Sequence, residues 1–143
     1  MTMKNVKVKI SSMKKKDSKE VTKIVIYNDR FEVLFLKRTP YEPKHAGELD
    51  LPGGHLNVGE ALLKGLAREV KEETGISNIE PVFFKKKKNK SYFYSKYSGE
   101  PIKLSHEHED FLFIAEEDFE KHNNLGGIFE KIALKVLRKV KNE

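Results

Sequence analysis

Residues 60–74 constrain the fold most, because they carry a helical repeat between two β-rich parts of the chain. Apolar residues recur in this segment at the spacing of one helix face, at Leu63, Leu66, Ala67 and Val70. Gly75 follows directly, and glycine readily adopts the left-handed backbone that ends many helices. The sequence therefore predicts a helix over residues 60–74 that ends at Gly75.

The flanking segments favour strands. Residues 21–27 and 31–37 are rich in β-branched and aromatic side chains, and the polar residues between them predict a hairpin. Both runs are apolar on both faces, which is typical of central strands covered on two sides. The other expected elements are an edge strand at 6–10, a loop over 11–20, an irregular segment over 39–51, a hairpin of 81–87 and 91–97, a strand over 110–115, a short helix over 116–122 and an amphipathic helix over 129–141. Strands between two helices indicate an α/β fold, an α/β/α sandwich around a mixed β-sheet.

Composition narrows the class of protein. The chain has 143 residues and no cysteine, so we expect one domain over residues 1–143 without disulfides, thiolate metal sites or a cysteine nucleophile. No apolar run approaches the roughly 18 residues that span a bilayer, and the basic N-terminus lacks the apolar core of a secretory signal. We therefore expect a cytoplasmic protein with no membrane partner. The net charge of +6 fits either a solvated lysine-rich surface or attraction to a polyanion such as a nucleotide.

Three carboxylates lie close together on the predicted helix. With about 100° per residue and Glu69 at zero, Glu72 falls near −60° and Glu73 near +40°. The apolar stripe falls between about 60° and 160°, so we expect the carboxylates at the edge of the core. Like charges at these spacings destabilise a helix by a few tenths of a kcal/mol per pair, which a divalent cation would offset. The segment therefore predicts a site for Mg²⁺ or Mn²⁺, with a solvated acidic face as the alternative.

Glycines surround this helix. Gly53 and Gly54 follow Pro52, and such a bend permits positive φ and exposes carbonyl groups that could add metal ligands. Gly65 falls near −40°, one turn before Glu69. The missing side chain of Gly65 leaves room for a ligand or a close backbone, unless the helix simply tolerates a glycine there.

The segment from Gly54 to Ile76 resembles the signature of the Nudix (MutT-type) hydrolases, GX5EX7REUXEEXGU, in which U is apolar. All nine specified positions match at the fixed spacing: Gly54, Glu60, Arg68, Glu69, Val70, Glu72, Glu73, Gly75 and Ile76. The order of strands and helices around this segment also resembles the α/β/α sandwich of that family.

The resemblance implies a divalent-metal-dependent enzyme that hydrolyses a nucleoside diphosphate linked to another group. By position, Glu69, Glu72 and Glu73 match the family's metal-binding and general-base carboxylates. Gly53 matches a residue whose carbonyl often binds metal, and Arg68 matches the arginine that orients the neighbouring glutamate.

Glu60 lies about 180° from Glu69 on a helix, so we expect it to support the site rather than bind metal. Mg²⁺ can bridge phosphate oxygens and activate a water, and a carboxylate can remove the proton of that water. Carboxylates alone would therefore suffice for this reaction, without a serine, cysteine or histidine nucleophile.

Residues 103–113 contain a second informative pattern. It resembles the segment S-x-E-H-x-x-x-x-aromatic of several Nudix groups, among them the diadenosine tetraphosphate hydrolases. Glu107 matches a glutamate that binds metal or acts as the base in some members, and the alternative is an acidic loop before a strand. We do not expect His106 and His108 to bind zinc, because no cysteine or second histidine pair accompanies them.

Substrate contacts are expected outside the signature. The candidates are Arg38 and Lys44 for phosphate, Gly54 for close backbone approach, and Tyr92 and Tyr94 for a nucleobase, unless these two tyrosines belong to the core. The lysines of residues 85–90 could meet phosphates or RNA, or form a solvated hairpin tip.

The sequence thus predicts a Mg²⁺-dependent pyrophosphohydrolase of a nucleoside triphosphate or dinucleoside polyphosphate, either monomeric or homodimeric. Mn²⁺ is the alternative ion. The alternative functions are pyrophosphate removal from an RNA 5′ end and nucleotide or RNA binding by a Nudix fold without turnover.

Overall fold

The computed structural model describes residues 18–143, so the strand expected at 6–10 and most of the loop expected at 11–20 lie outside the described residues. The elements are β1 (Val21–Tyr27), β2 (Glu32–Arg38), β3 (Leu49–Asp50), β4 (Gly53–His55), α2 (Leu62–Thr74), β5 (Val82–Lys87), β6 (Lys90–Lys96), β7 (His108–Ala115), the 3₁₀ helix η2 (Glu116–Lys121) and α3 (Gly127–Lys141). The predicted elements within residues 18–143 are all present, with boundaries that move by at most two residues.

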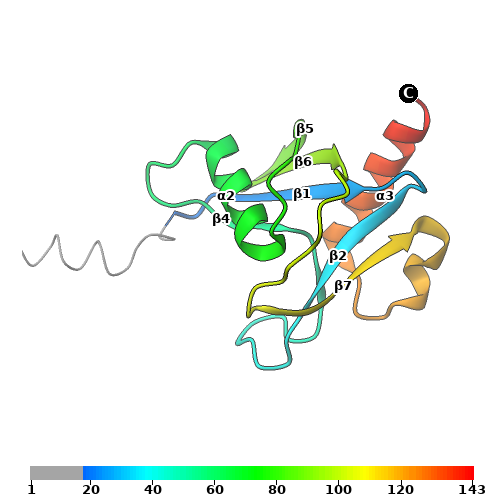
Figure 1. Ribbon diagram of the computed structural model, residues 1–143, viewed down its shortest axis with the longest axis horizontal. Helices are drawn as coiled ribbons and strands as arrows, with labels where there is room; N and C mark the ends of the chain where they lie inside the picture. Colours follow the sequence, from blue (N-terminus) through cyan, green and yellow to red (C-terminus); the bar gives the residue numbers. More distant parts are fainter. Residues whose placement is uncertain (1–17) are drawn as a thin grey trace, which may run out of the picture.

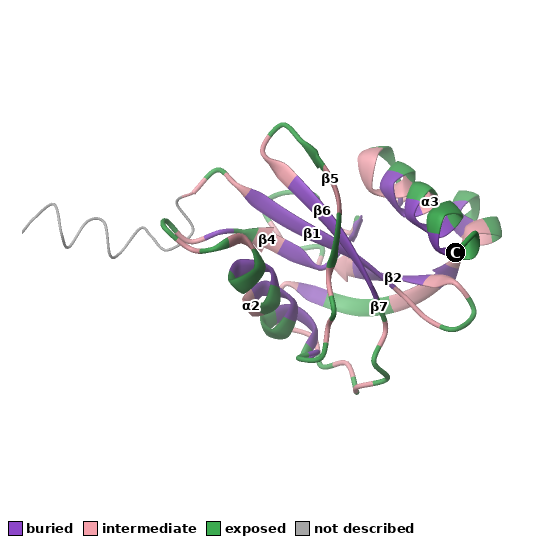
Figure 2. Ribbon diagram, turned by 90° about the horizontal axis from the view of Figure 1, so that it is seen from above, coloured by how far each residue is buried: buried purple, intermediate pink, exposed green. Residues whose placement is uncertain are grey.

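The chain forms the predicted α/β/α sandwich. A mixed sheet lies between α2 and α3, which cover opposite faces of it (Figure 1). Seen from above, the buried strands run between the two helices (Figure 2). Alternation along β1 divides the core, because Ile24 and Ile26 face α2 whereas Val25 faces α3. Within residues 18–143, no helix is long and apolar enough to cross a bilayer.

The first hairpin opens away from its turn. β1 and β2 are paired at Tyr27 and Val33, as predicted, but then separate and take different neighbours. β1 pairs in parallel with β6 and antiparallel with β4, whereas β2 pairs antiparallel with β7 and β3. Residues 49–55 fill the opening between the two strands, and this placement brings the diglycine bend next to α2.

Gly53 allows the closest backbone approach in this region. Its φ is +123°, and a Cβ there would lie 2.1 Å from the carbonyl oxygen of Thr22. The positive φ predicted for the glycine bend is therefore present at Gly53. The pairing of β4 with β1 requires a residue without a side chain at this position.

α2 ends as predicted, at Gly75, whose φ is +79° and whose N–H bonds the carbonyl of Lys71. The buried face of α2 differs from the prediction. It consists of Gly65, Leu66, Glu69, Val70, Glu73 and Thr74, whereas Leu63 is 55% exposed and Ala67 is exposed. The carboxylates of Glu69 and Glu73 thus lie within the buried face, not at its edge, because the backbone of residues 53–56 packs against this side of the helix.

Gly65 provides space for the chain itself. A Cβ at Gly65 would lie 2.1 Å from Cδ2 of Leu56 and 3.0 Å from a carboxylate oxygen of Glu60. The space beside Gly65, in which the sequence predicted a ligand or a close backbone, is therefore occupied by the side chain of Leu56.

A Gly53→Ala substitution tests the importance of the close approach at β4. Gly59 provides the matched control, because its φ is +78° but a Cβ there would meet nothing within 4 Å. We expect Gly59→Ala to lower the free energy of unfolding by about 1 kcal/mol through backbone strain alone, and Gly53→Ala by at least about 3 kcal/mol. Urea unfolding of both variants measures the difference, and equal losses would contradict this account of β4.

Candidate active site

A cavity of about 840 Å³ lies where the first hairpin opens. Its wall is formed by β1, β2, the diglycine bend, α2, the start of β6, the loop before β7, and the loop before α3 with the start of that helix. The lining residues are Val21, Lys23, Arg38, Lys44, His45, Glu48, Leu49, Asp50, Gly53, Gly54, His55, Glu69, Glu73, Lys90, Glu107, Asn123, Asn124 and 126–129.

Glu73 extends from the last turn of α2 into this cavity. Its side chain is buried, and its Oε1 accepts a hydrogen bond of 2.9 Å from the backbone N–H of Gly53. Burial raises the pKa of Glu73 to about 8; the nearby carboxylates of Asp50 and Glu69 add to this, and Lys23 opposes it. A cation beside Glu73 would favour its charged form.

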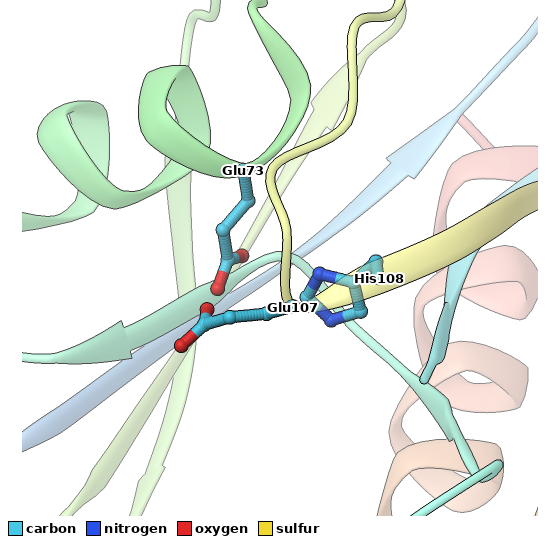
Figure 3. Close-up of side chains that lie close together, drawn as sticks. All are labelled: Glu73, Glu107 and His108. Atoms are coloured by element: carbon cyan, nitrogen blue, oxygen red, sulfur yellow. The ribbon is translucent and has the colours of Figure 1, made fainter. Parts of the chain in front are cut away.

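Glu107 lies opposite Glu73. Figure 3 shows the two carboxylates facing each other, with the imidazole of His108 beside them. One potential ligand atom from each of Glu73, Glu107 and His108 lies within 4.8 Å of the other two. The structure therefore brings the second sequence pattern to the helix that carries the first.

Glu69 is held by its neighbours in a defined position. A Cβ at Gly54 would lie 2.5 Å from Oε1 of Glu69, so only glycine lets the carboxylate rest against this backbone. Nη1 of Arg68 donates a hydrogen bond of 2.8 Å to Oε2 of Glu69. Gly54, which we expected at the substrate, thus contacts Glu69 and also lines the cavity.

Arg68 is anchored in turn by Glu60. Nε and Nη2 of Arg68 bond the two oxygens of the Glu60 carboxylate at 2.8 and 2.9 Å. These bonds raise the pKa of Arg68 above its already high value, so the guanidinium keeps its charge. Nη1 also reaches Glu72, at 3.2 Å. The repulsion expected among the helix carboxylates is therefore offset in part by Arg68.

Glu72 occupies a different environment from Glu69 and Glu73. Its side chain is 53% exposed and it does not line the cavity. This follows from its place on the helix, about 60° from Glu69 on the side away from the core.

A buried lysine lies beneath the carboxylates. Nζ of Lys23 donates to Oδ1 of Asp50 at 2.9 Å and to the carbonyl oxygens of Leu51 and Gly53 at 3.0 Å each. Burial would lower the pKa of Lys23, but the charges of Asp50 and Glu73 raise it overall. Burial would likewise raise the pKa of Asp50, but Lys23 and His108 hold it at about 2.

Two of the five residues predicted to contact substrate do not reach the cavity. Arg38 and Lys44 line it, as does Gly54, but Tyr92 and Tyr94 are buried in the core on the α3 side. β6 lies between β1 and β5 in the sheet, so every second side chain of β6 is covered by α3. The prediction that these two tyrosines stack on a base does not fit this placement.

Lys23, Asp50, His108 and Phe129 are among the residues of the site that were not predicted from the sequence. Lys23 carried a usable signal, because a lysine in the middle of an apolar strand must find a buried partner. Phe129 matched the apolar spacing of α3, but it lines the cavity, and the Nζ atoms of Lys23 and Lys90 lie 5.5 and 5.8 Å from its ring centre.

Comparison with known proteins defines the class of this site. A family model described as the NUDIX domain matches residues 18–134, most of the chain. The chain therefore belongs to the Nudix family of hydrolases, enzymes that act on pyrophosphate bonds and use divalent metals. A search of curated protein sequences gave no match.

Solved structures agree with this assignment. A MutT protein from Methanosarcina mazei Go1 shares 32% identity with a TM-score of 0.67, over 85% of this chain and 94% of that chain. An Ap4A hydrolase from C. elegans shares the fold at 24% identity and a TM-score of 0.68, over 87% and 100% of the two chains. A NUDIX-family hydrolase from Clostridium perfringens shares the fold at 17% identity and a TM-score of 0.64, over 84% and 96%.

An Asp50→Asn substitution tests the buried ion pair. We expect it to lower the free energy of unfolding at pH 7 by about 3–5 kcal/mol, because it leaves the Lys23 ammonium buried without its anion. The pKa of Asp50 is about 2 in the folded protein against an ordinary value of 3.8. The contribution of the Asp50 carboxylate to the free energy of unfolding is therefore present above about pH 4 and is lost as the pH falls through about 2.

Urea unfolding at several pH values should therefore show that the difference in free energy of unfolding between wild type and Asp50→Asn becomes smaller below about pH 4. Asp110→Asn, at an exposed position, serves as the control and should change stability by less than about 0.5 kcal/mol. A difference in free energy of unfolding for Asp50→Asn that stays constant down to pH 2.5 would contradict the ion pair between Asp50 and Lys23.

Proposed function

We propose that the protein is a divalent-metal-dependent pyrophosphohydrolase that cleaves a phosphoanhydride bond of a nucleoside triphosphate or a dinucleoside polyphosphate. One observation carries this proposal. Two buried glutamates of α2, Glu69 and Glu73, meet Glu107 at a cavity that is also lined by Arg38 and Lys44. Acidic groups suited to a cation thus lie beside basic groups suited to phosphate.

The residues present fit a divalent cation. Carboxylate and carbonyl oxygens are the ligands that Mg²⁺ and Mn²⁺ prefer. We assign Glu69 and Glu73 as the main ligands, with Glu107 on the opposite side. Glu72, which is half-exposed and does not line the cavity, is assigned as a metal ligand by its position in the signature alone. The carbonyl of Gly53 already accepts a hydrogen bond from Lys23, so its second lone pair is the one left for a metal.

Bound divalent cations supply charge neutralisation on the pyrophosphate and a lowered pKa for the attacking water. The chain supplies the remaining parts of the reaction. Arg68 keeps the Glu69 carboxylate in one orientation, and either Glu69 or Glu107 accepts the proton of the water. The leaving phosphate needs no strong acid. Because water is the nucleophile, the reaction also needs no serine or cysteine nucleophile.

The cavity also supports a nucleotide as the substrate. Arg38 and Lys44 on one side and Lys90 on the other can contact a chain of phosphates. Phe129 offers an aromatic ring at the same cavity, in the role that we expected of the two core tyrosines. Lys90 begins β6, close to the four lysines at residues 85–88, which end β5 and begin the turn. This continuity favours the 5′ end of an RNA as the second candidate substrate.

A panel of substrates tests the proposal directly. The panel comprises nucleoside triphosphates, dinucleoside polyphosphates, sugar nucleotides and 5′-triphosphate RNA, each with Mg²⁺ or with EDTA. We expect Mg²⁺-dependent release of phosphate, pyrophosphate or a nucleotide from at least one of the first two classes. Turnover of the RNA alone would favour the second candidate, and no product from any class would overturn the proposal.

Glutamine variants test the assigned residues. We expect Glu69→Gln and Glu73→Gln each to lower kcat/KM at least about 100-fold, because each loses a charged ligand or base. The matched control is Glu80→Gln, at an exposed position after α2 that does not line the cavity. Thermal unfolding should show all three variants folded. Wild-type turnover in both helix variants would refute the assignment.

A further inference from the structure

We propose that His108 joins Glu73 and Glu107 in a mixed nitrogen–oxygen cation site, at which Mn²⁺ or Co²⁺ binds in preference to Mg²⁺. The inference rests on the proposed function only in that Glu73 and Glu107 serve both assignments. It concerns which cation the chain selects, and its test requires no turnover.

The imidazole of His108 has one nitrogen without a partner. The side chain is fully buried, with 0% exposure, and its Nε2 lies 3.3 Å from Oδ2 of Asp50. Among the residues that the structure describes, Nδ1 of His108 is buried and has no hydrogen-bond partner. A buried polar atom without a partner destabilises the fold, so its position calls for a ligand.

Two carboxylates lie beside this imidazole. In Figure 3, Glu73 extends from α2 toward the carboxylate of Glu107, which ends the loop before β7. The ring of His108, at the start of β7, lies beside them. Their potential ligand atoms lie within 4.8 Å of one another. A cation held about 2.1 Å from each ligand allows separations up to about 4.2 Å, so no pair needs to close by more than roughly 0.6 Å.

Asp50 prepares the histidine for this role. When its carboxylate accepts the Nε2–H of His108, the lone pair of the neutral ring remains on Nδ1. This carboxylate–histidine arrangement commonly supports a metal-bound imidazole in proteins, because it sets both the tautomer and the ring orientation. Lys23 holds the other oxygen of Asp50 at 2.9 Å, so the carboxylate that orients the ring is itself held in place.

The nitrogen ligand determines which cation the site prefers. Mg²⁺ and Ca²⁺ favour sites made of oxygen alone, whereas imidazole suits later divalent metals. A site of two carboxylates and one imidazole should therefore bind Co²⁺ most tightly, with Mn²⁺, which also suits oxygen ligands, between Co²⁺ and Mg²⁺. Removal of the nitrogen should reduce these differences.

His108→Gln isolates the ligand nitrogen, because the amide N–H of glutamine can replace the Nε2–H that faces Asp50 but leaves nothing at Nδ1. His106→Gln is the matched control, since His106 is exposed on the same loop. Isothermal titration of the full chain with MnCl₂, CoCl₂ and MgCl₂, without nucleotide, gives the three dissociation constants for each protein.

We expect His108→Gln to weaken Mn²⁺ and Co²⁺ binding at least about tenfold and Mg²⁺ binding less than about threefold. His106→Gln should leave all three constants within twofold of wild type. Manganese and cobalt constants for His108→Gln within twofold of wild type would overturn the proposal.

A second measurement needs no variant. Pulsed electron paramagnetic resonance of the Mn²⁺-loaded wild-type protein should detect coupling to a directly bound ¹⁴N nucleus, and its absence would also overturn the proposal. A negative result in either binding measurement would overturn the nitrogen ligand but would not affect the proposed hydrolysis. A negative result in the substrate panel would overturn the proposed hydrolysis but would not affect the nitrogen ligand. The two proposals are therefore tested separately.

Discussion

The ammonium group of Lys23 holds together the part of the fold on which the site depends. It lies buried in β1 and bonds three oxygens of residues 50–53. This set of contacts fixes the bend that fills the opening between β1 and β2. The bend in turn presents the N–H of Gly53 to Glu73 and the bare backbone of Gly54 to Glu69. A buried ion pair contributes little net stability on average, so the main effect of the pair between Lys23 and Asp50 is to hold the bend in position.

The second constraint is the burial of two glutamates on one helix face. Glu69 is paired with Arg68, which Glu60 anchors from the other side. Glu73 receives a hydrogen bond from Gly53 and the more distant charge of Lys23, and its pKa is raised to about 8 as a result of burial. A carboxylate kept in such a place at a cost in stability is typical of a functional site, where a ligand supplies the missing charge.

Local features of the sequence predicted most elements, because their causes are local. The apolar repeat and Gly75 define α2, the polar turns define the two hairpins, and the pattern over residues 54–76 identifies the carboxylates. The α/β/α arrangement followed from the order of these elements.

What the sequence did not reveal depends on contacts between distant segments. The opening of the first hairpin is set by the pairing of β1 with β6 and of β2 with β7. The face of α2 that is buried is set by the backbone of residues 53–56, and the burial of Tyr92 by the position of β6 in the sheet. The partnership of His108 with Asp50 spans 58 positions of the chain, so no local pattern could show it.

Anomalous diffraction from crystals grown with Mn²⁺ and a non-hydrolysable nucleotide tests the central claim most directly. The account predicts an anomalous peak within ligand distance of the Glu73 carboxylate, with the phosphates of the nucleotide on the side of Arg38 and Lys44. Nucleotide bound in this cavity with no manganese at Glu73 or Glu69, in an enzyme that requires the metal for turnover, would contradict it.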